Sequence, residues 1–338
     1  TAVTALADAG CDIICDDLCF FHQPFLQDGD VAAHIRQTLM QHPGLIYVTV
    51  SGNFAPLHYQ GSWRSSGDEL SGGILHDFSD GDTAITITLL PTEYIIATLQ
   101  WDDPWDRAVN DYDLILTSQE TGEIISESRF VQNITSEPFE HLVYNPEGPG
   151  PETLSLSIIR NGESQDPGIL ELFIRGVDPG GVQDSFVKDP RDSVFGHAAI
   201  EEVVTVGSVD ASAPFTISPD SSQGPVTIRY PDARRWKPDI CAPTNVNVSG
   251  AGDFPSRFPG TSAAAPHVAG VIAQLWSAFP DLSRDDLIHA VYEAADDLGA
   301  PGWDATYGYG LLNAERAYRI LYDRSRASFT GTGPDPGV

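Results

Sequence analysis

A serine at the start of an expected helix is the side chain of this 338-residue sequence best suited to nucleophilic chemistry. The run FPGTSAAAPHVAG spans residues 258–270, with a turn at Gly260 and with Ser262 two residues later. Apolar residues then recur at helical spacing, which predicts a helix with one buried face. At a helix N-terminus, backbone N–H groups can stabilise negative charge that develops near the hydroxyl. A plain helix cap is the alternative role for Ser262, because serine is a favoured capping residue.

The elements before this serine are typical of an open α/β sheet. Residues 11–18 form a short apolar strand, and residues 30–41 have the spacing of an amphipathic helix. Residues 44–50 are almost continuously apolar, as in a buried parallel strand, and residues 51–53 (Ser-Gly-Asn) follow directly. In such sheets, functional loops lie at the carboxyl ends of the strands.

Residues 61–176 have a different pattern, with short stretches of period-two alternation between turn signals. This pattern predicts an all-β sandwich or jelly-roll domain inserted into the α/β fold. The expected strands cover residues 85–89, 94–101, 112–117, 124–128, 154–160 and 170–174. Carboxylates gather at residues 101–106 and 110–113, where calcium could bind because hard cations prefer oxygen ligands. Solvated loop carboxylates at strand ends are the alternative.

Several short motifs follow in a recognisable order. An α/β pattern returns with a strand at residues 198–209, and a helix capped by Ser283 is expected at residues 282–295. The motifs are SQGP at residues 222–225, KPDICAP at 237–243 and YGYGLLNA at 307–314. Together with the serine run and the Gly-Asn pair at residues 52–53, they resemble the subtilisin-like serine peptidases over roughly residues 10–58 and 195–322.

This resemblance implies a parallel sheet flanked by helices and the activity of a serine endopeptidase. It makes Ser262 the nucleophile and Asn53 a donor to the oxyanion, with a strand-end turn as the alternative role for Asn53. It also implies protein or peptide substrates docked in an extended form, and it implies no cofactor. The substrate-binding residues that it implies are Asp17, Leu18, Ser51 and Gly52. The expected domains are an α/β part at residues 1–60, the β insertion at 61–176, a second α/β part at 177–325 and a flexible tail at 326–338.

The catalytic triad of the family is where this chain departs from the resemblance. The family's triad runs Asp, His, Ser along the chain, and neither an Asp-Ser-Gly nor a His-Gly-Thr motif occurs here. We therefore expect a fragment of a longer enzyme, with the Asp and His upstream and with poor activity on its own. His267, five residues after Ser262, is expected to pack in the core rather than to act as the general base.

A second departure is the pair Asp16-Asp17, where the family usually has a Ser-Leu-Gly-like edge of the primary specificity pocket. A carboxylate at that wall favours a Lys or Arg side chain in the substrate. Alternatively, Asp17 pairs with an internal arginine or caps backbone N–H groups. A third role is proton transfer, as carboxylates perform in the sedolisins. The oxyanion donor of those distant relatives is an Asp where this chain has Asn53.

Composition excludes some other classes of function. The formal net charge of −30 without a basic patch argues against binding to nucleic acid or to an anionic membrane surface. No run of 18 apolar residues is present, and residues 1–10 lack the pattern of a secretory signal. The resemblance to secreted bacterial peptidases nevertheless favours a secreted or cell-envelope protein. The four cysteines, at 11, 15, 19 and 241, are expected to be buried small side chains rather than a metal site or disulfides.

Two rival functions follow from the same residues. A subtilisin-fold module that binds without catalysis would lack the upstream Asp and His. A lipase-like α/β-hydrolase would carry a Gly-x-Ser-x-Gly elbow, and the Gly-Thr-Ser-Ala-Ala run around Ser262 counts against it.

Overall fold

A sheet of four parallel strands, in the order β1-β2-β13-β16, is the centre of the α/β half of the chain. The strands are β1 (Ile13–Cys15), β2 (Ile46–Val50), β13 (Val204–Asp210) and β16 (Ile240–Thr244). All of β2 is buried, as expected for a strand covered on both faces. This computed structural model describes residues 1–131, 137–162, 168–249 and 256–330.

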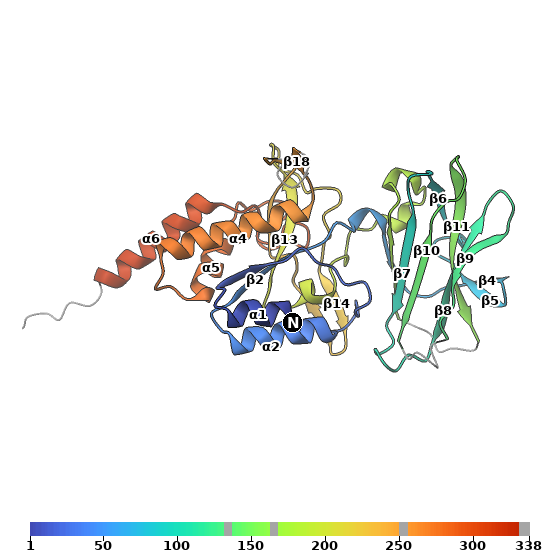
Figure 1. Cartoon of the computed structure of the whole chain (residues 1–338), viewed down its shortest axis with the longest axis horizontal. Coiled ribbons are helices and arrows are strands. Elements are labelled where there is room, and N and C mark those ends of the chain that lie inside the picture. Colours follow the sequence, from blue (N-terminus) through green and yellow to red (C-terminus); the bar gives the residue numbers. More distant parts are fainter. Residues whose placement is uncertain (132–136, 163–167, 250–255, 331–338) are drawn as a thin grey trace, which may run out of the picture.

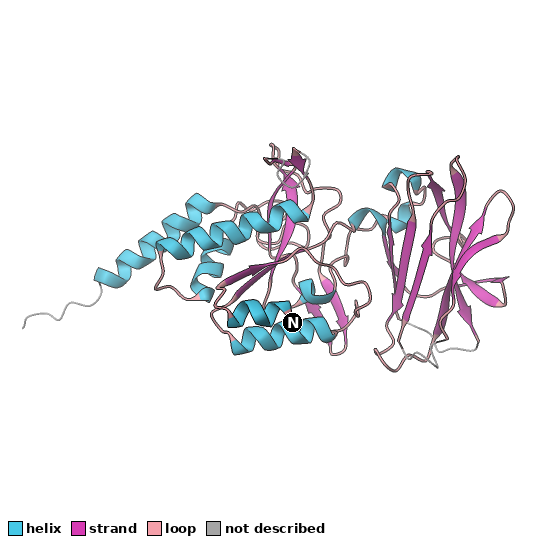
Figure 2. Cartoon of the chain, in the orientation of Figure 1, coloured by secondary structure: helices cyan, strands magenta, loops and turns pink. Residues whose placement is uncertain are grey.

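Helices cover both faces of this sheet (Figures 1 and 2). They are α1 (Ala2–Asp8), α2 (Asp30–Gln41), α4 (Thr261–Ala278), α5 (Arg284–Ala294) and α6 (Ala314–Thr330). Tyr47 of β2 packs with α1 and α2 on one face, whereas Val48 packs with α4, α5 and α6 on the other. Successive side chains of a strand point to opposite faces, so both layers are anchored by the same short strand. No helix within the described ranges is both long and apolar enough to span a membrane.

Between β2 and β13 the chain forms two antiparallel sheets. One has the order β10-β7-β12-β3, and the other has the order β4-β5-β11-β8-β9 with β6 also paired to β11. The strands of the first sheet are β3 (His58–Gly61), β7 (Ile95–Trp101), β10 (Phe139–Tyr144) and β12 (Leu170–Arg175). Those of the second are β4 (Ser65–Leu70), β5 (Gly73–His76), β6 (Ile85–Leu89), β8 (Asp111–Ser118), β9 (Ile124–Ser128) and β11 (Glu152–Asn161).

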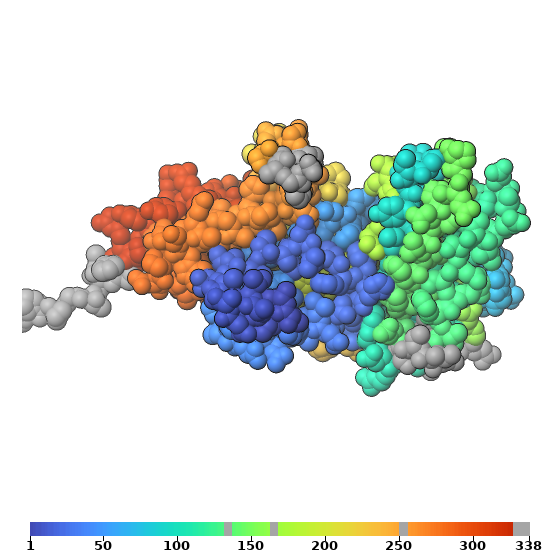
Figure 3. All heavy atoms as spheres, in the orientation of Figure 1, coloured from blue at the N-terminus to red at the C-terminus, as the bar shows by residue number. Residues whose placement is uncertain are grey.

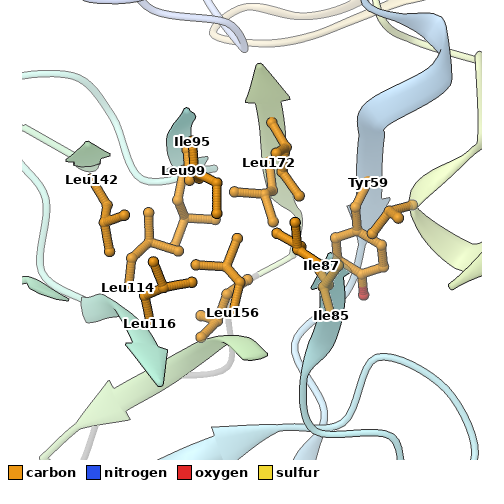
Figure 4. Close-up of a cluster of buried hydrophobic side chains, with 14 of the residues drawn as sticks. Tyr59, Ile85, Ile87, Ile95, Leu99, Leu114, Leu116, Leu142, Leu156 and Leu172 are labelled. Carbon is orange, nitrogen blue, oxygen red and sulfur yellow. The ribbon is translucent and has the colours of Figure 1, made fainter. Parts of the chain in front are cut away.

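The inner faces of these two sheets enclose an apolar core of their own (Figure 4). Leu99 and Leu172 of the first sheet meet Leu116 and Leu156 of the second, and all four side chains are fully buried. The period-two alternation of these strands places every second side chain in this core. We call residues 58–175 the β unit. Its status as a separate domain stays a prediction.

The outer face of the first sheet holds the loop that follows β1. Gln100 of β7 accepts a hydrogen bond from the Phe25 amide at 2.9 Å and donates to the Gln23 carbonyl at 2.9 Å. Phe173 of β12 packs with Phe21 and Phe25 in a shared aromatic cluster. In Figure 3 the blue surface of the N-terminal region accordingly meets the green surface of the β unit. The two halves therefore share buried contacts.

The remaining elements are short. Single turns of 3₁₀ helix lie at η1 (Ala55–Leu57), η2 (Pro179–Gly181), η3 (Ser185–Val187) and η4 (Gly196–Ala199). Two hairpins are formed by β14 (Val226–Arg229) with β15 (Asp232–Arg235), and by β17 (Val246–Asn247) with β18 (Arg257–Phe258).

Several expectations need correction. The expected strand at 198–209 begins as a 3₁₀ turn, and the strand itself starts at Val204. The expected tail at 326–338 is helical as far as Thr330, where α6 ends; its other residues lie outside the described ranges. Cys15 is exposed, since β1 ends there at the edge of the sheet, whereas Cys241 is buried.

Candidate active site

Ser262 lies in the first turn of α4, where the chain leaves the β17–β18 hairpin. The N-cap of this helix is Gly260, with φ +85°, and no side chain caps the helix. Ser262 Oγ instead donates a hydrogen bond to Asp17 Oδ1 at 2.9 Å. The capping role considered for Ser262 is therefore wrong. The helix start brings together a hydroxyl, a carboxylate and first-turn N–H groups that lack intrahelical partners.

Asn53 reaches the same helix start from the end of β2. Its Oδ1 accepts hydrogen bonds from the Thr261 amide at 2.9 Å and from Thr261 Oγ1 at 3.1 Å. Because the Thr261 amide can only donate, the amide oxygen of Asn53 must face it, and Nδ2 is left as a donor. A side chain at Gly260 would meet Asn53 Nδ2 at 2.8 Å, and its φ already favours glycine. Gly260 thus permits both the turn and the close approach of Asn53.

Asp16 and Asp17 are adjacent in sequence but lie in contrasting environments. Burial raises the pKa of Asp17, the hydrogen bond from Ser262 partly offsets this, and the charge of Asp16 raises it further. Burial also opposes ionisation of Asp16, but hydrogen bonds from His197, Thr49 and Tyr47 outweigh it and hold the pKa of Asp16 below its usual value. The pKa values of Asp16 and Asp17 are thus shifted in opposite directions. Pairs of acids with such opposite shifts recur in acid–base catalytic sites.

The partners of Asp16 form a network that the sequence did not reveal. Tyr47 donates to Asp16 Oδ2 at 2.5 Å, Thr49 donates to Oδ1, and His197 Nε2 lies 3.1 Å from Oδ2. Tyr47 and Thr49 are two residues apart on β2 and so share one face of the sheet. This spacing was the one feature of the sequence that could have indicated the network. His197 could not be predicted, because it lies almost 150 positions after Thr49 in the chain.

The other residues expected to bind substrate surround this point. Leu18 is 54% exposed, whereas Ser51 is buried and the Gly52 carbonyl accepts a hydrogen bond from the Ser222 amide at 2.9 Å. A mostly apolar pocket of about 430 Å³ opens beside Leu18, between that residue and α2. Its lining includes Leu18, Phe20, Val31 and Ile35, with Asp16 and Tyr47 at its polar end. Leu18 is thus free to contact another chain, while Ser51 and Gly52 lie behind the surface.

His267 was expected in the core, and this expectation is wrong. Its side chain is exposed, and its Nδ1 lies 2.6 Å from the Ala263 carbonyl oxygen of the preceding turn. The buried stripe of α4 follows Ala264, Val268 and Ile272, which places position 267 on another face.

The carboxylates considered for calcium are engaged within the protein. Asp103 accepts hydrogen bonds from the Val109 and Asn110 amides at 2.9 and 2.8 Å, and Asp102 accepts one from the Gly168 amide at 2.9 Å. Over the ranges that the structure covers, no group of three or more His, Cys, Asp or Glu side chains is arranged to hold a metal. The calcium hypothesis remains a prediction without support from this geometry.

Comparison with known proteins relates this chain to serine peptidases. The profile of the subtilase family matches residues 175–310. The autotransporter lipoprotein NalP of Neisseria meningitidis is 37% identical over 78 residues, which are 23% of this chain and 7% of that protein. An extracellular serine protease of Serratia marcescens is 45% identical over 58 residues, covering 17% and 6%. A thermostable alkaline protease of Halalkalibacterium halodurans is 39% identical over 80 residues, covering 23% and 21%.

A solved structure extends the likeness to nearly the whole chain. The CspB protease of Clostridium perfringens superposes with a TM-score of 0.59 over 95% of this chain and 68% of that one. At 17% sequence identity, this match concerns the fold alone. The resemblance to subtilisin-like serine peptidases is thus confirmed, although the aligned regions cover at most about a fifth of the curated relatives named above.

Proposed function

We propose that this chain carries the nucleophile and the oxyanion donor of a subtilisin-type serine endopeptidase. The observation that carries the proposal is the position of Asn53, whose amide oxygen is held by Thr261, the residue before Ser262, while Nδ2 donates no hydrogen bond among the described residues. Donors preorganised in this way stabilise charge that appears only in the transition state. A structural turn residue would not need its amide oriented towards the start of α4.

In the proposed reaction, Ser262 Oγ bonds to the carbonyl carbon of a peptide and the carbonyl oxygen takes the electron pair. Asn53 Nδ2 and the Ser262 N–H donate to that oxygen. The C–N bond then breaks, the amine leaves with a proton, and an acyl-enzyme remains on Ser262. Water attacks this ester, which releases the carboxylic acid and restores the hydroxyl.

The proton of Ser262 needs an acceptor at the moment of attack. Asp17 accepts the hydrogen bond of Ser262 at 2.9 Å, so we infer that it orients the hydroxyl. We further propose that the Asp and His of the family's triad come from chain upstream of residue 1. Of the three roles considered for Asp17, its contact with Ser262 favours one in the reaction over an ion pair with an internal arginine.

The substrates would be proteins or peptides that lie in extended form beside Asp17 and Leu18. Leu18 is exposed, and the apolar pocket next to it could receive a substrate side chain. The names of the relatives include an extracellular protease and an autotransporter, which supports action outside the cytoplasm. A calcium requirement is a separate proposal that rests on composition alone.

A fluorophosphonate probe tests the function directly, because it phosphonylates only activated serines. We expect the reading frame extended upstream of residue 1 to be labelled at Ser262 and to hydrolyse casein. The Ser262→Ala variant should do neither. If the extended wild-type protein folds but Ser262 stays unlabelled, the non-catalytic binding module becomes the better account.

A further inference from the structure

An arginine at the end of β12 lies beside the loop that leads away from Asp17. The guanidinium carbon of Arg175 is 3.7 Å from the centroid of the Phe21 ring, a cation–π contact. The Phe21 ring in turn contacts Phe54, with centroids 5.0 Å apart, and Phe54 directly follows Asn53. Arg175 is therefore two ring contacts away from the proposed oxyanion donor.

The charge of Arg175 has no counterpart in the described part of the chain. It makes no ion pair there, and its buried Nε has no hydrogen-bond partner. By contrast, Arg36 and Arg235 both bind Asp28, at 2.7 and 2.6 Å. Burial lowers the pKa of Arg175, yet a guanidinium stays charged at neutral pH. A half-buried cation without an ion pair is available to an anion that comes from outside, and its position near Asp17 is what separates Arg175 from other such arginines.

Two histidines lie near Arg175 and add imidazole groups to this surface. The rings of His22 and His141 lie with centroids 4.9 Å apart, and His22 is exposed. Burial, followed by the positive charges of His22 and Arg175, lowers the pKa of His141, and no carboxylate opposes this effect. Guanidinium and imidazole N–H groups thus gather on one surface formed by the loop after β1, β10 and β12.

The distance from this surface to the nucleophile suits a peptide substrate. Asp17 contacts Ser262, and the four residues from there to Phe21 span at most about 14 Å. Cys19 lies between Asp17 and Phe21 and is close to charges at both ends of this segment. Burial raises the pKa of Cys19, Asp16 and Asp17 raise it further, and Arg175 lowers it. An extended peptide along this segment would place a side chain within about four residues of the scissile bond at Arg175.

We propose that Arg175, assisted by His22 and His141, forms a subsite that selects an Asp or Glu side chain of the substrate. This inference rests on the proposed function, because it takes the substrate to lie along residues 17–21. A guanidinium binds a carboxylate with two parallel hydrogen bonds, whereas the matching amide would leave the cation unpaired. The subsite therefore discriminates Glu from Gln more strongly than size alone would allow.

Binding to the Ser262→Ala form of the chain tests this subsite without requiring turnover. The probes are fluorescent, C-terminally amidated nonapeptides in which Glu or Gln is placed at one position at a time. We expect Glu to bind at least tenfold more tightly than Gln at one position or two adjacent positions, measured by fluorescence anisotropy. An additional Gln peptide with a free C-terminus determines whether a terminal carboxylate can occupy the site instead.

Arg175→Gln should remove this preference, and Arg160→Gln is the matched control. Arg160 also lies in the β unit, stacks over an aromatic ring at 4.9 Å and has a buried Nε without a partner, but its ring is Trp63. Arg175→Lys should keep part of the preference, and thermal melting checks that each variant folds.

Equal binding of Glu and Gln at every position, or a preference that survives Arg175→Gln, would overturn the proposal. A complete lack of peptide binding would also contradict it. These results leave the peptidase function intact if Ser262 is labelled by fluorophosphonate. Conversely, a Glu preference in a protein whose Ser262 never reacts would support the subsite and reject catalysis.

Discussion

The α/β half and the β unit place their polar side chains in different ways. In the α/β half, polar side chains that follow short parallel strands meet the start of α4, where Asp17 accepts a hydrogen bond from Ser262 and Asn53 accepts one from Thr261. In the β unit, the strands are longer, the space between the sheets is apolar, and polar side chains such as Gln100 and Glu171 lie on the outer face. The α/β half thus holds the candidate site. The β unit supports the loop after β1, which carries Asp17.

The largest expected effect comes from the nucleophile itself. Ser262→Ala should lower turnover of the extended enzyme by about 10⁶, the loss known for the equivalent change in subtilisin. Thermal melting of the β unit should not change, because Ser262 contacts none of its core. Residues 1–338 alone should hydrolyse peptide esters poorly, and robust hydrolysis that Ser262→Ala abolishes would contradict that expectation.

Phe173→Ala tests whether the β unit supports the site. Phe173 is fully buried in the aromatic cluster that it shares with Phe21 and Phe25, so its removal should cost about 3–5 kcal/mol of unfolding free energy. Because it holds the loop after β1, we also expect slower labelling of Ser262 by fluorophosphonate.

Leu156→Ala is the matched control, since Leu156 is equally buried but lies between the two sheets. It should destabilise by a comparable amount, about 2–5 kcal/mol, and leave the labelling rate of the folded protein unchanged. Equal labelling rates in both variants would support the separable domain expected for residues 61–176, which a Gly/Ser linker could then replace. The Phe173 contacts instead predict that such a deletion exposes the aromatic cluster.

Asn53→Ala should reduce turnover by about 10²–10³ with little change in KM, as for removal of one oxyanion donor in subtilisin. The reason is that its hydrogen bond to the oxyanion forms only as the transition state is reached. Steady-state kinetics of the protein extended upstream of residue 1 measure the turnover number and KM separately. A normal turnover number would mean that Asn53 only orients Thr261.

Asp17→Asn separates the roles of the carboxylate beside Ser262. The amide can still accept the hydrogen bond of Ser262 but carries no charge, so we expect about a tenfold loss of turnover on all peptides. A peptide library provides the measurement. Selective loss of Lys or Arg substrates with turnover kept would instead identify Asp17 as a specificity residue, and no change would leave it structural.

The smallest expected effect is a pH dependence in the β unit. Burial raises the pKa of Glu171 to about 7, although its contact with His58 at 3.5 Å opposes this. A raised pKa in the folded state means that stability is full below the unfolded pKa near 4.5 and declines as pH rises through 7. We expect Tm to fall by a few degrees between pH 5 and 8.

Glu171→Gln should flatten this part of the Tm profile, as followed by calorimetry. Asp16, in the α/β half, has the opposite sign: its lowered pKa provides stability that is lost only in strong acid. An unchanged slope in Glu171→Gln would show that Glu171 is ionised throughout this range.

Local pattern determined much of this protein. Continuous apolar runs and helical spacing predicted β2 and α2, and period-two alternation predicted strands such as β6 and β9, because burial on one or both faces dictates these periods. The Gly-Thr-Ser run placed Ser262 at a helix start for the same local reason, since only glycine suits the turn at position 260.

Contacts between distant segments were decided by the tertiary structure alone. The bonds of Ser262 to Asp17 and of Asn53 to Thr261 join residues 245 and 208 positions apart, and no local period encodes such pairs. The exposure of His267, the network around Asp16 and the unpaired charge of Arg175 also depend on which surfaces the sheets and helices cover. The sequence alone therefore indicated Ser262 and Asn53 as candidate site residues, and their catalytic roles stay predictions. Packing decided which partners shift the pKa values of Asp16 and Asp17, and which charges have no ion pair among the described residues.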